Sequence, residues 1–176
     1  FHYAPERTLY YTSFTKITLP GLRIGYLVAP DRYVAAVANR HLVSNWMATP
    51  MVAEIASKWV SDGTAMELVR WQRGALEKRQ AIVTEVLGHG RAMTHPRALH
   101  LWLKLPGDRS EADFVAQARL QGVAIAPGAS FRTSDQPWEP AVRISLGSTT
   151  EGELRAGLGI ISRLLLGEAE HLLLAI

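Results

Sequence analysis

Residues 13–16 read Ser-Phe-Thr-Lys, and residues 20–26 read Pro-Gly-Leu-Arg-Ile-Gly-Tyr. Residues 9–14 are rich in Tyr, Thr and Phe, which predicts a strand that ends directly before Lys16. Residues 22–29 form a nearly continuous apolar run, which predicts a second, buried strand after a Pro-Gly turn. A lysine that follows a strand lies at the edge of a sheet and faces a crevice. This stretch therefore predicts that Lys16 belongs to a site.

The side chains around Lys16 have the chemistry that a phosphorylated aldehyde requires. A partly desolvated amine attacks an aldehyde to form a Schiff base and can later move protons. The hydroxyl groups of Ser13 and Thr15 and the guanidinium group of Arg23 can donate hydrogen bonds to a phosphate dianion. A lysine considered alone is most often a solvated loop residue, so the prediction rests on the whole string.

The string S-x-x-K followed by P-G-x-R-x-G resembles the cofactor-lysine segment of class I and II aminotransferases, which have the α/β architecture of fold type I. The resemblance implies that Lys16 carries pyridoxal 5'-phosphate (PLP). It also implies that Ser13 and Arg23 bind the phosphate group of PLP, with Thr15 as a weaker counterpart. The family's aspartate that pairs with the pyridine nitrogen, and the aromatic residue that stacks on the ring, are expected before Phe1.

A second stretch resembles the same family. Residues 141–147 read Ala-Val-Arg-Ile-Ser-Leu-Gly and resemble the strand that presents the arginine for the substrate carboxylate. Residues 122–128 resemble another element of the family's small domain. The resemblance implies that Arg143 binds the carboxylate group of a small amino-acid or keto-acid substrate, a role that needs a bidentate guanidinium. Considered alone, Arg143 is equally consistent with an outward charge on an edge strand.

The predicted order is strand, strand, three helices, two strands, helix, two strands, helix. The first two strands have too few neighbours for a stable sheet, whereas the later elements can close into a pair of layers. With the resemblance, this order implies the C-terminal portion of a fold-type-I PLP transferase. Residues 1–48 are then the end of the large PLP-binding domain with the cofactor lysine, and residues 49–176 are the small α+β domain. We expect a further amino-terminal part of the protein before Phe1, because the chain opens without Met.

Local signals mark several element boundaries. Leucine alternates with other residues from 99 to 105, which predicts a strand with one buried face. Helix starts carry capping signals at four places: Thr49 before Pro50, Thr64 with Glu67, Ser110, and Thr150 with Glu153.

The resemblance is closest to the aminotransferase-like domains of MocR-type regulators in the GntR group. Those regulators usually have glycines where Arg97 and Ala98 stand here. Two functions follow: amino-group transfer on a small amino acid, or a PLP- or amino-acid-responsive domain of a transcriptional regulator. For both we expect a homodimer when the protein has its full length, with DNA contacted only through an amino-terminal winged helix. As an enzyme, the 176-residue chain alone is expected to be inactive.

Composition argues against other classes. The chain has no cysteine, so it has neither a disulfide nor a thiolate metal site, which is consistent with a cytoplasmic protein. Its net charge is +3 with scattered Lys and Arg, its six histidines lack the i, i+4 spacing of a metal pair, and no apolar run is long enough to span a bilayer. Ser13-x-x-Lys16 also matches the start of a serine acyl-transfer pattern, but that pattern's S-D-N and K-T-G are absent from the sequence.

Overall fold

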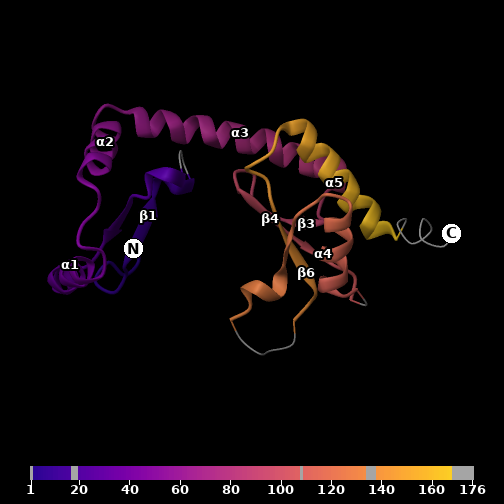
Figure 1. Cartoon of the computed structure of the whole chain (residues 1–176), viewed down its shortest axis with the longest axis horizontal. Coiled ribbons are helices and arrows are strands. Elements are labelled where there is room, and N and C mark those ends of the chain that lie inside the picture. Colours follow the sequence, from indigo (N-terminus) through magenta and orange to yellow (C-terminus); the bar gives the residue numbers. More distant parts are fainter. Residues whose placement is uncertain (1, 17–19, 108, 134–137, 168–176) are drawn as a thin grey trace. The chain divides into compact units, whose positions relative to one another are not determined.

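A computed structural model describes residues 2–16, 20–107, 109–133 and 138–167 (Figure 1). The chain divides into two compact units, Phe1–Gln72 and Arg73–Ile176. The division falls inside the long helix α3, which spans Thr64–Leu87. The predicted domain boundary, between residues 48 and 49, lies within the first unit and stays a prediction.

The first unit contains a two-stranded antiparallel sheet, two 3-10 turns and two helices. Its small core consists of Phe14, Ile24 and Ala56, with Trp59 packed against them. In chain order the elements are β1 (Tyr10–Ser13), η1 (Phe14–Lys16), η2 (Pro20–Leu22), β2 (Gly25–Val28), α1 (Asp31–Asn45) and α2 (Pro50–Ser61), followed by the start of α3.

The prediction of a buried second strand was wrong. Leu22 belongs to η2, and Arg23 has a positive φ of 49°, so extended structure begins only at Gly25. All four residues of β2 are exposed. The reason is that β1 is the one strand that pairs with β2 among the described residues, and apolar strands become buried only when other layers cover the sheet.

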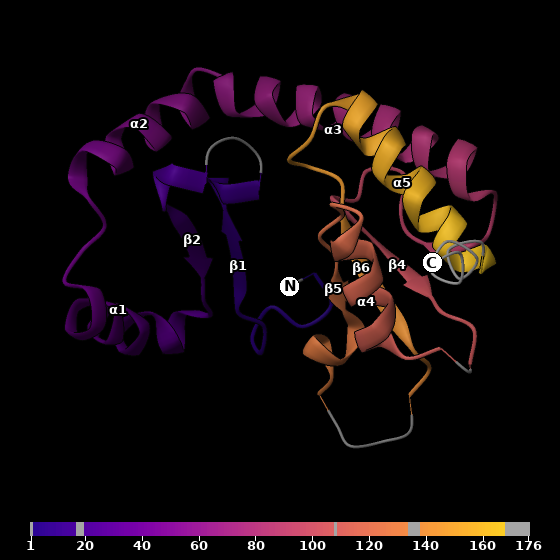
Figure 2. The same ribbon diagram turned by 45° about the vertical axis from the view of Figure 1, so that its right-hand side comes forward.

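The second unit contains a four-stranded antiparallel sheet in the order β3-β4-β6-β5. Helices α4, α5 and the later part of α3 contribute to its core, and α3 runs beside α5 (Figure 2). The elements after α3 are β3 (Ala92–Met93), β4 (His100–Lys104), α4 (Glu111–Leu120), β5 (Ala126–Pro127), η3 (Gly128–Phe131), β6 (Ala141–Ser145) and α5 (Glu151–Leu166).

The predicted leucine face is present. Leu101, Leu103 and Leu105 are buried and pack in one cluster with Phe114 of α4 and Leu158 of α5. The intervening residues of β4 point to the other face of the sheet because side chains alternate along a strand. The helices of this unit therefore cover one face of the sheet.

Two of the four predicted caps form. Ser110 accepts a hydrogen bond from the backbone of Asp113, and Thr150 with Glu153 makes a full capping box. The side chain of Thr49 makes no capping bond. The prediction for Thr64 was wrong: helix α3 begins at Thr64 itself, and the carboxylate of Asp62 accepts from its backbone N–H at 3.0 Å.

Replacing Leu158 by Ala should destabilise the protein. The side chain is 1 % exposed, and deleting buried methyl groups leaves a cavity, so we expect a loss of about 2–5 kcal/mol in the free energy of unfolding. Leu120→Ala is the matched control, because Leu120 is 87 % exposed. Urea unfolding of both full-length variants measures the difference, and equal midpoints would contradict the position of Leu158 in the core.

Candidate functional site

Lys16 ends the short turn η1 in the first unit, and its side chain is exposed. The strand before it stops at Ser13, so the prediction that the strand runs directly to the lysine was wrong. Phe14 explains the early end, because its buried ring turns inward and packs against Tyr26 and Trp59, with ring centroids 6.0 and 6.1 Å away.

The two segments of the lysine string lie side by side. Ser13 pairs with Gly25 across the two strands, and the backbone N–H of Phe14 donates to the carbonyl of Ile24 at 3.2 Å. Ser13 is half-buried at the end of β1, one residue before η1. The pairing therefore brings the Ser13–Lys16 turn next to the turn that ends at Arg23.

Arg23 has an unusual backbone conformation. Its φ of 49° lies in the left-handed region, which costs a residue with a β-carbon about 1 kcal/mol or more. Strain of this kind is found most often at functional sites. Arg23 is exposed at the point where the chain leaves η2 and enters β2.

The donor set in these turns fits a phosphorylated aldehyde. Ser13, Thr15, Lys16 and Arg23 supply two hydroxyl groups, one primary amine and one guanidinium, and the structure brings all four into the same small part of the first unit. Hydroxyl and guanidinium groups bind phosphate, and an amine bonds to an aldehyde.

Arg143 belongs to the second unit, in the central strand β6. It pairs with Trp102 on β4 and with Ala126 on β5, and the centre of its guanidinium lies 4.4 Å from the centroid of the Phe131 ring. Its Nε is buried and has no hydrogen-bond partner among the described residues. A buried N–H without an acceptor costs about 1–3 kcal/mol, so this group is suited to an acceptor such as a carboxylate.

Aromatic side chains surround this arginine. Trp102 makes edge contacts with Phe131 and Trp138, at centroid distances of 5.8 and 5.6 Å. Sequence reasoning missed Phe131 and Trp138, because the segment from 130 to 140 has no periodicity. The one available signal was a pair of aromatic residues in a largely polar, proline-containing segment.

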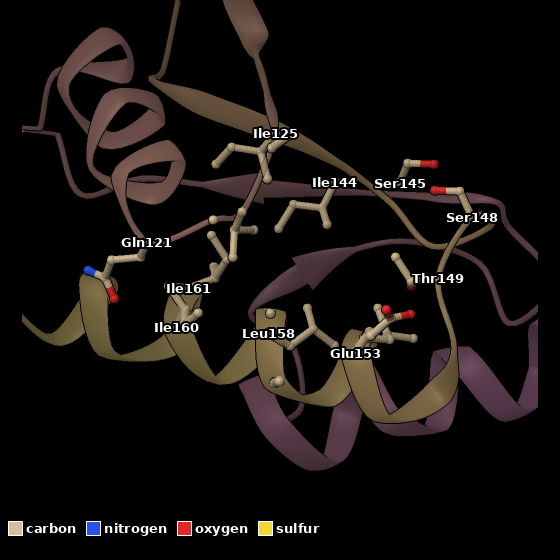
Figure 3. A pocket seen from close by; sticks show the side chains of 16 residues that line it. Gln121, Ile125, Ile144, Ser145, Ser148, Thr149, Glu153, Leu158, Ile160 and Ile161 are labelled. Atoms are coloured by element: carbon tan, nitrogen blue, oxygen red, sulfur yellow. The ribbon is translucent and has the colours of Figure 1, made fainter.

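A cavity of about 490 Å³ lies on the opposite side of β6 from Arg143. It is lined by one side of α5, by Ile144 and by the segment 121–125, with Ser145, Ser148 and Glu153 among its polar residues (Figure 3). The described residues that line it include neither Arg143 nor its aromatic neighbours Phe131, Trp102 and Trp138. The cavity is therefore separate from the arginine and its aromatic neighbours.

Within the described ranges, no three His, Asp or Glu side chains are placed to hold a metal ion together. In the same ranges, no helix has both the length and the apolar character that crossing a membrane requires.

The fold is that of the carboxy-terminal portion of a fold-type-I transferase. The sequence model of the family aminotransferase class I and II matches residues 3–161, so the chain belongs to that family. Among its relatives, the uncharacterised HTH-type transcriptional regulator YdeF of Bacillus subtilis is 27% identical over 93% of this chain and 36% of its own length. The 2-aminoadipate transaminase of Thermus thermophilus is 25% identical over 90% of this chain and 41% of its own length.

The fold is also similar to solved structures of aminotransferases. Kynurenine aminotransferase of Pyrococcus horikoshii superposes with a TM-score of 0.84 over 93% of this chain and 41% of that chain, at 20% identity. The predicted fold class and the predicted resemblance to aminotransferases and regulators are thus confirmed. The chain spans little more than a third of the length of the curated relatives it matches.

Gly25→Ala should disturb the lysine turn. A β-carbon at position 25 would lie 2.9 Å from the ring of Tyr11 and 3.0 Å from the carbonyl of Thr12, so we expect a loss of about 1–3 kcal/mol in stability. Gly21→Ala is the matched control, because no atom of the described residues lies within 4 Å of its β-carbon position. Thermal unfolding of the full-length variants measures both changes. A wild-type midpoint for Gly25→Ala would contradict the close approach of Tyr11.

Proposed function

We propose that the full-length protein binds PLP through Lys16 and transfers amino groups on a small amino acid. The observation that carries the proposal is the pairing of the Lys16 turn with the turn at Arg23. This pairing brings the amine close to the groups that can donate hydrogen bonds to a phosphate. Membership in the aminotransferase class I and II family supports it. Activity, substrate and partners are proposed for the whole protein, of which this chain is one part.

The chain's own residues have separate roles in this proposal. PLP, when bound, supplies an electron sink that stabilises negative charge at the substrate's α-carbon. Lys16 would hold PLP through its Nζ, and the same amine, when free of the cofactor, would move a proton at the substrate's α-carbon. Ser13, Thr15 and Arg23 hold the phosphate group. Arg143 orients the substrate by two parallel hydrogen bonds to its carboxylate.

A second candidate is the sensing domain of a MocR-type regulator. Similarity to the HTH-type regulator YdeF favours it. The same residues would then bind PLP and an amino acid as a signal, and an amino-terminal winged helix would contact DNA. For both candidates we infer a homodimer in the cytoplasm, and the absence of cysteine is compatible with that reducing compartment. Steady-state transamination by the full-length protein separates the two, because a sensor needs no turnover.

Reduction with borohydride should fix PLP to Lys16. The reagent converts the bond between an amine and an aldehyde into a stable one, so mass spectrometry of the digested full-length protein should find the added mass on the peptide that contains Lys16. Lys16→Ala should remove the label and the absorbance of bound cofactor. A label on another lysine would overturn the assignment.

Arg23→Ala should weaken retention of PLP much more than Arg143→Ala. A charge-assisted bond to the phosphate dianion contributes about 1.5–3 kcal/mol, whereas Arg143 is assigned to the substrate. Equilibrium dialysis against PLP measures cofactor affinity in both variants, and spectral titration with amino acids measures substrate affinity. Equal losses of cofactor affinity would contradict the division of roles.

A further inference from the structure

The carboxylate of Glu111 accepts three hydrogen bonds from residues outside its own helix, α4. One carboxylate oxygen accepts from the indole Nε1 of Trp138 at 3.0 Å and from the backbone N–H of Ala141 at 2.7 Å. The other oxygen accepts from the backbone N–H of Ala129 at 2.9 Å. Ala129 lies in η3 and Ala141 begins β6, so a single side chain joins both ends of the connection between these elements.

Glu111 is itself held firmly. It is half-buried in the first turn of α4, and Phe114 and Ala118 anchor that helix in the core. The cap of α4 is Ser110, so the carboxylate of Glu111 is free to bond outside the helix. It therefore provides a fixed acceptor for the connection.

The aromatic neighbours of Arg143 lie at the two ends of this connection: Phe131 is the last residue of η3, and Trp138 lies three residues before β6. The ring of Phe131 lies over the guanidinium, and Trp138 contacts Trp102, which is paired with Arg143 on the neighbouring strand. Phe131 and Trp138 are 41 % and 36 % exposed. Glu111 bonds directly to the indole of Trp138 and to the backbone of Ala129, two residues before Phe131, so its hydrogen bonds restrain the chain next to both rings.

We propose that Glu111 is a positioning residue for Arg143. Its carboxylate fixes the segment that holds Phe131 against one face of the guanidinium, which leaves the N–H edge of Arg143 oriented for a carboxylate. The proposal rests on the proposed function in one respect, namely that Arg143 binds the carboxylate of the substrate. Glu111 touches neither substrate nor cofactor in this role.

The first measurement is chemical and needs no substrate. Phenylglyoxal modifies guanidinium groups, and mass spectrometry of the peptide that contains Arg143 gives the rate of modification in the full-length, PLP-loaded protein. Glu111→Ala should raise that rate severalfold, because the ring of Phe131 no longer stays on the guanidinium. The matched control is Glu85→Ala, which removes a carboxylate of the same unit that bonds to Arg155 and should leave the rate unchanged.

The second measurement is the affinity for a carboxylate ligand. The probe is the L-amino acid that gives the unmodified protein its largest change in cofactor absorbance. Glu111→Ala should raise the half-saturating concentration about tenfold, equivalent to about 1.4 kcal/mol. Where the protein turns over, KM should rise with little change in kcat, because the binding that is lost is common to ground and transition states.

Two milder variants keep the test decisive if Glu111→Ala does not fold. Glu111→Gln retains one acceptor oxygen, and Trp138→Phe removes the indole donor and leaves a smaller aromatic ring at the same position. Both should give smaller increases in modification rate and half-saturating concentration than Glu111→Ala. Folded variants with an unchanged phenylglyoxal rate at Arg143 would overturn the proposal, as would a fall in kcat at constant KM.

The outcomes also separate this proposal from the proposed function. If Arg143→Ala leaves amino-acid affinity unchanged, the substrate role of Arg143 fails, and the phenylglyoxal rates still decide whether Glu111 positions the guanidinium. If Arg143→Ala abolishes that affinity and Glu111→Ala changes neither measurement, the substrate role stands and the positioning role fails.

Discussion

The antiparallel pairing of β4 with β6 determines which side chains of the second unit are buried in its core and which lie on the opposite face of its sheet. It places Leu101 opposite Ile144 and Leu103 opposite Val142 on the face that the helices cover. The same register puts Trp102 opposite Arg143 on the other face. Because side chains alternate along each strand, burying the leucines and presenting the arginine are one and the same constraint. A slip of one residue would bury a guanidinium and expose the core.

The first unit is held by much weaker forces. Among the described residues its core cluster has three buried members, while apolar side chains such as Tyr11, Leu27 and Trp46 are exposed. The positions of the Lys16 amine and of the hydrogen-bond donors for a phosphate nevertheless depend on this unit, through the pairing of β1 with β2. The part of the chain with the richest site chemistry thus has the least packing of its own.

Local sequence signals predicted most elements correctly where the cause is local. The leucine alternation at β4, the capping box of Thr150 with Glu153, and the end of α3 before Gly88 are all set by residues close in sequence. The exposure of β2 was not predictable in this way, because burial of a strand depends on other layers that pack against its sheet. The predicted order has two strands between the third and fourth helices, but only the second was located, because a two-residue strand such as β3 has no periodicity.

The same distinction holds for the candidate site. Lys16, Ser13 and Arg23 could be predicted as site residues because they belong to one continuous string, and Arg143 because it lies in a second; their roles stay predictions. Glu111 and Phe131 were missed, since their relation to Arg143 joins α4, η3 and β6 across up to 32 positions of the sequence. Contacts between such distant residues leave no pattern in a single sequence.

At Arg23, which has a left-handed backbone conformation, the stability of the folded chain and the positive charge of the side chain favour different residues. A glycine at this position would relieve the conformational strain and favour the folded chain, yet it would remove the cation from the turn beside Lys16. Substitutions at position 23 that are enriched for thermal tolerance are therefore the ones that abolish the positive charge. Protein engineering that optimises stability alone would erode this turn first, and its damage would pass unnoticed in any assay that reports only on folding.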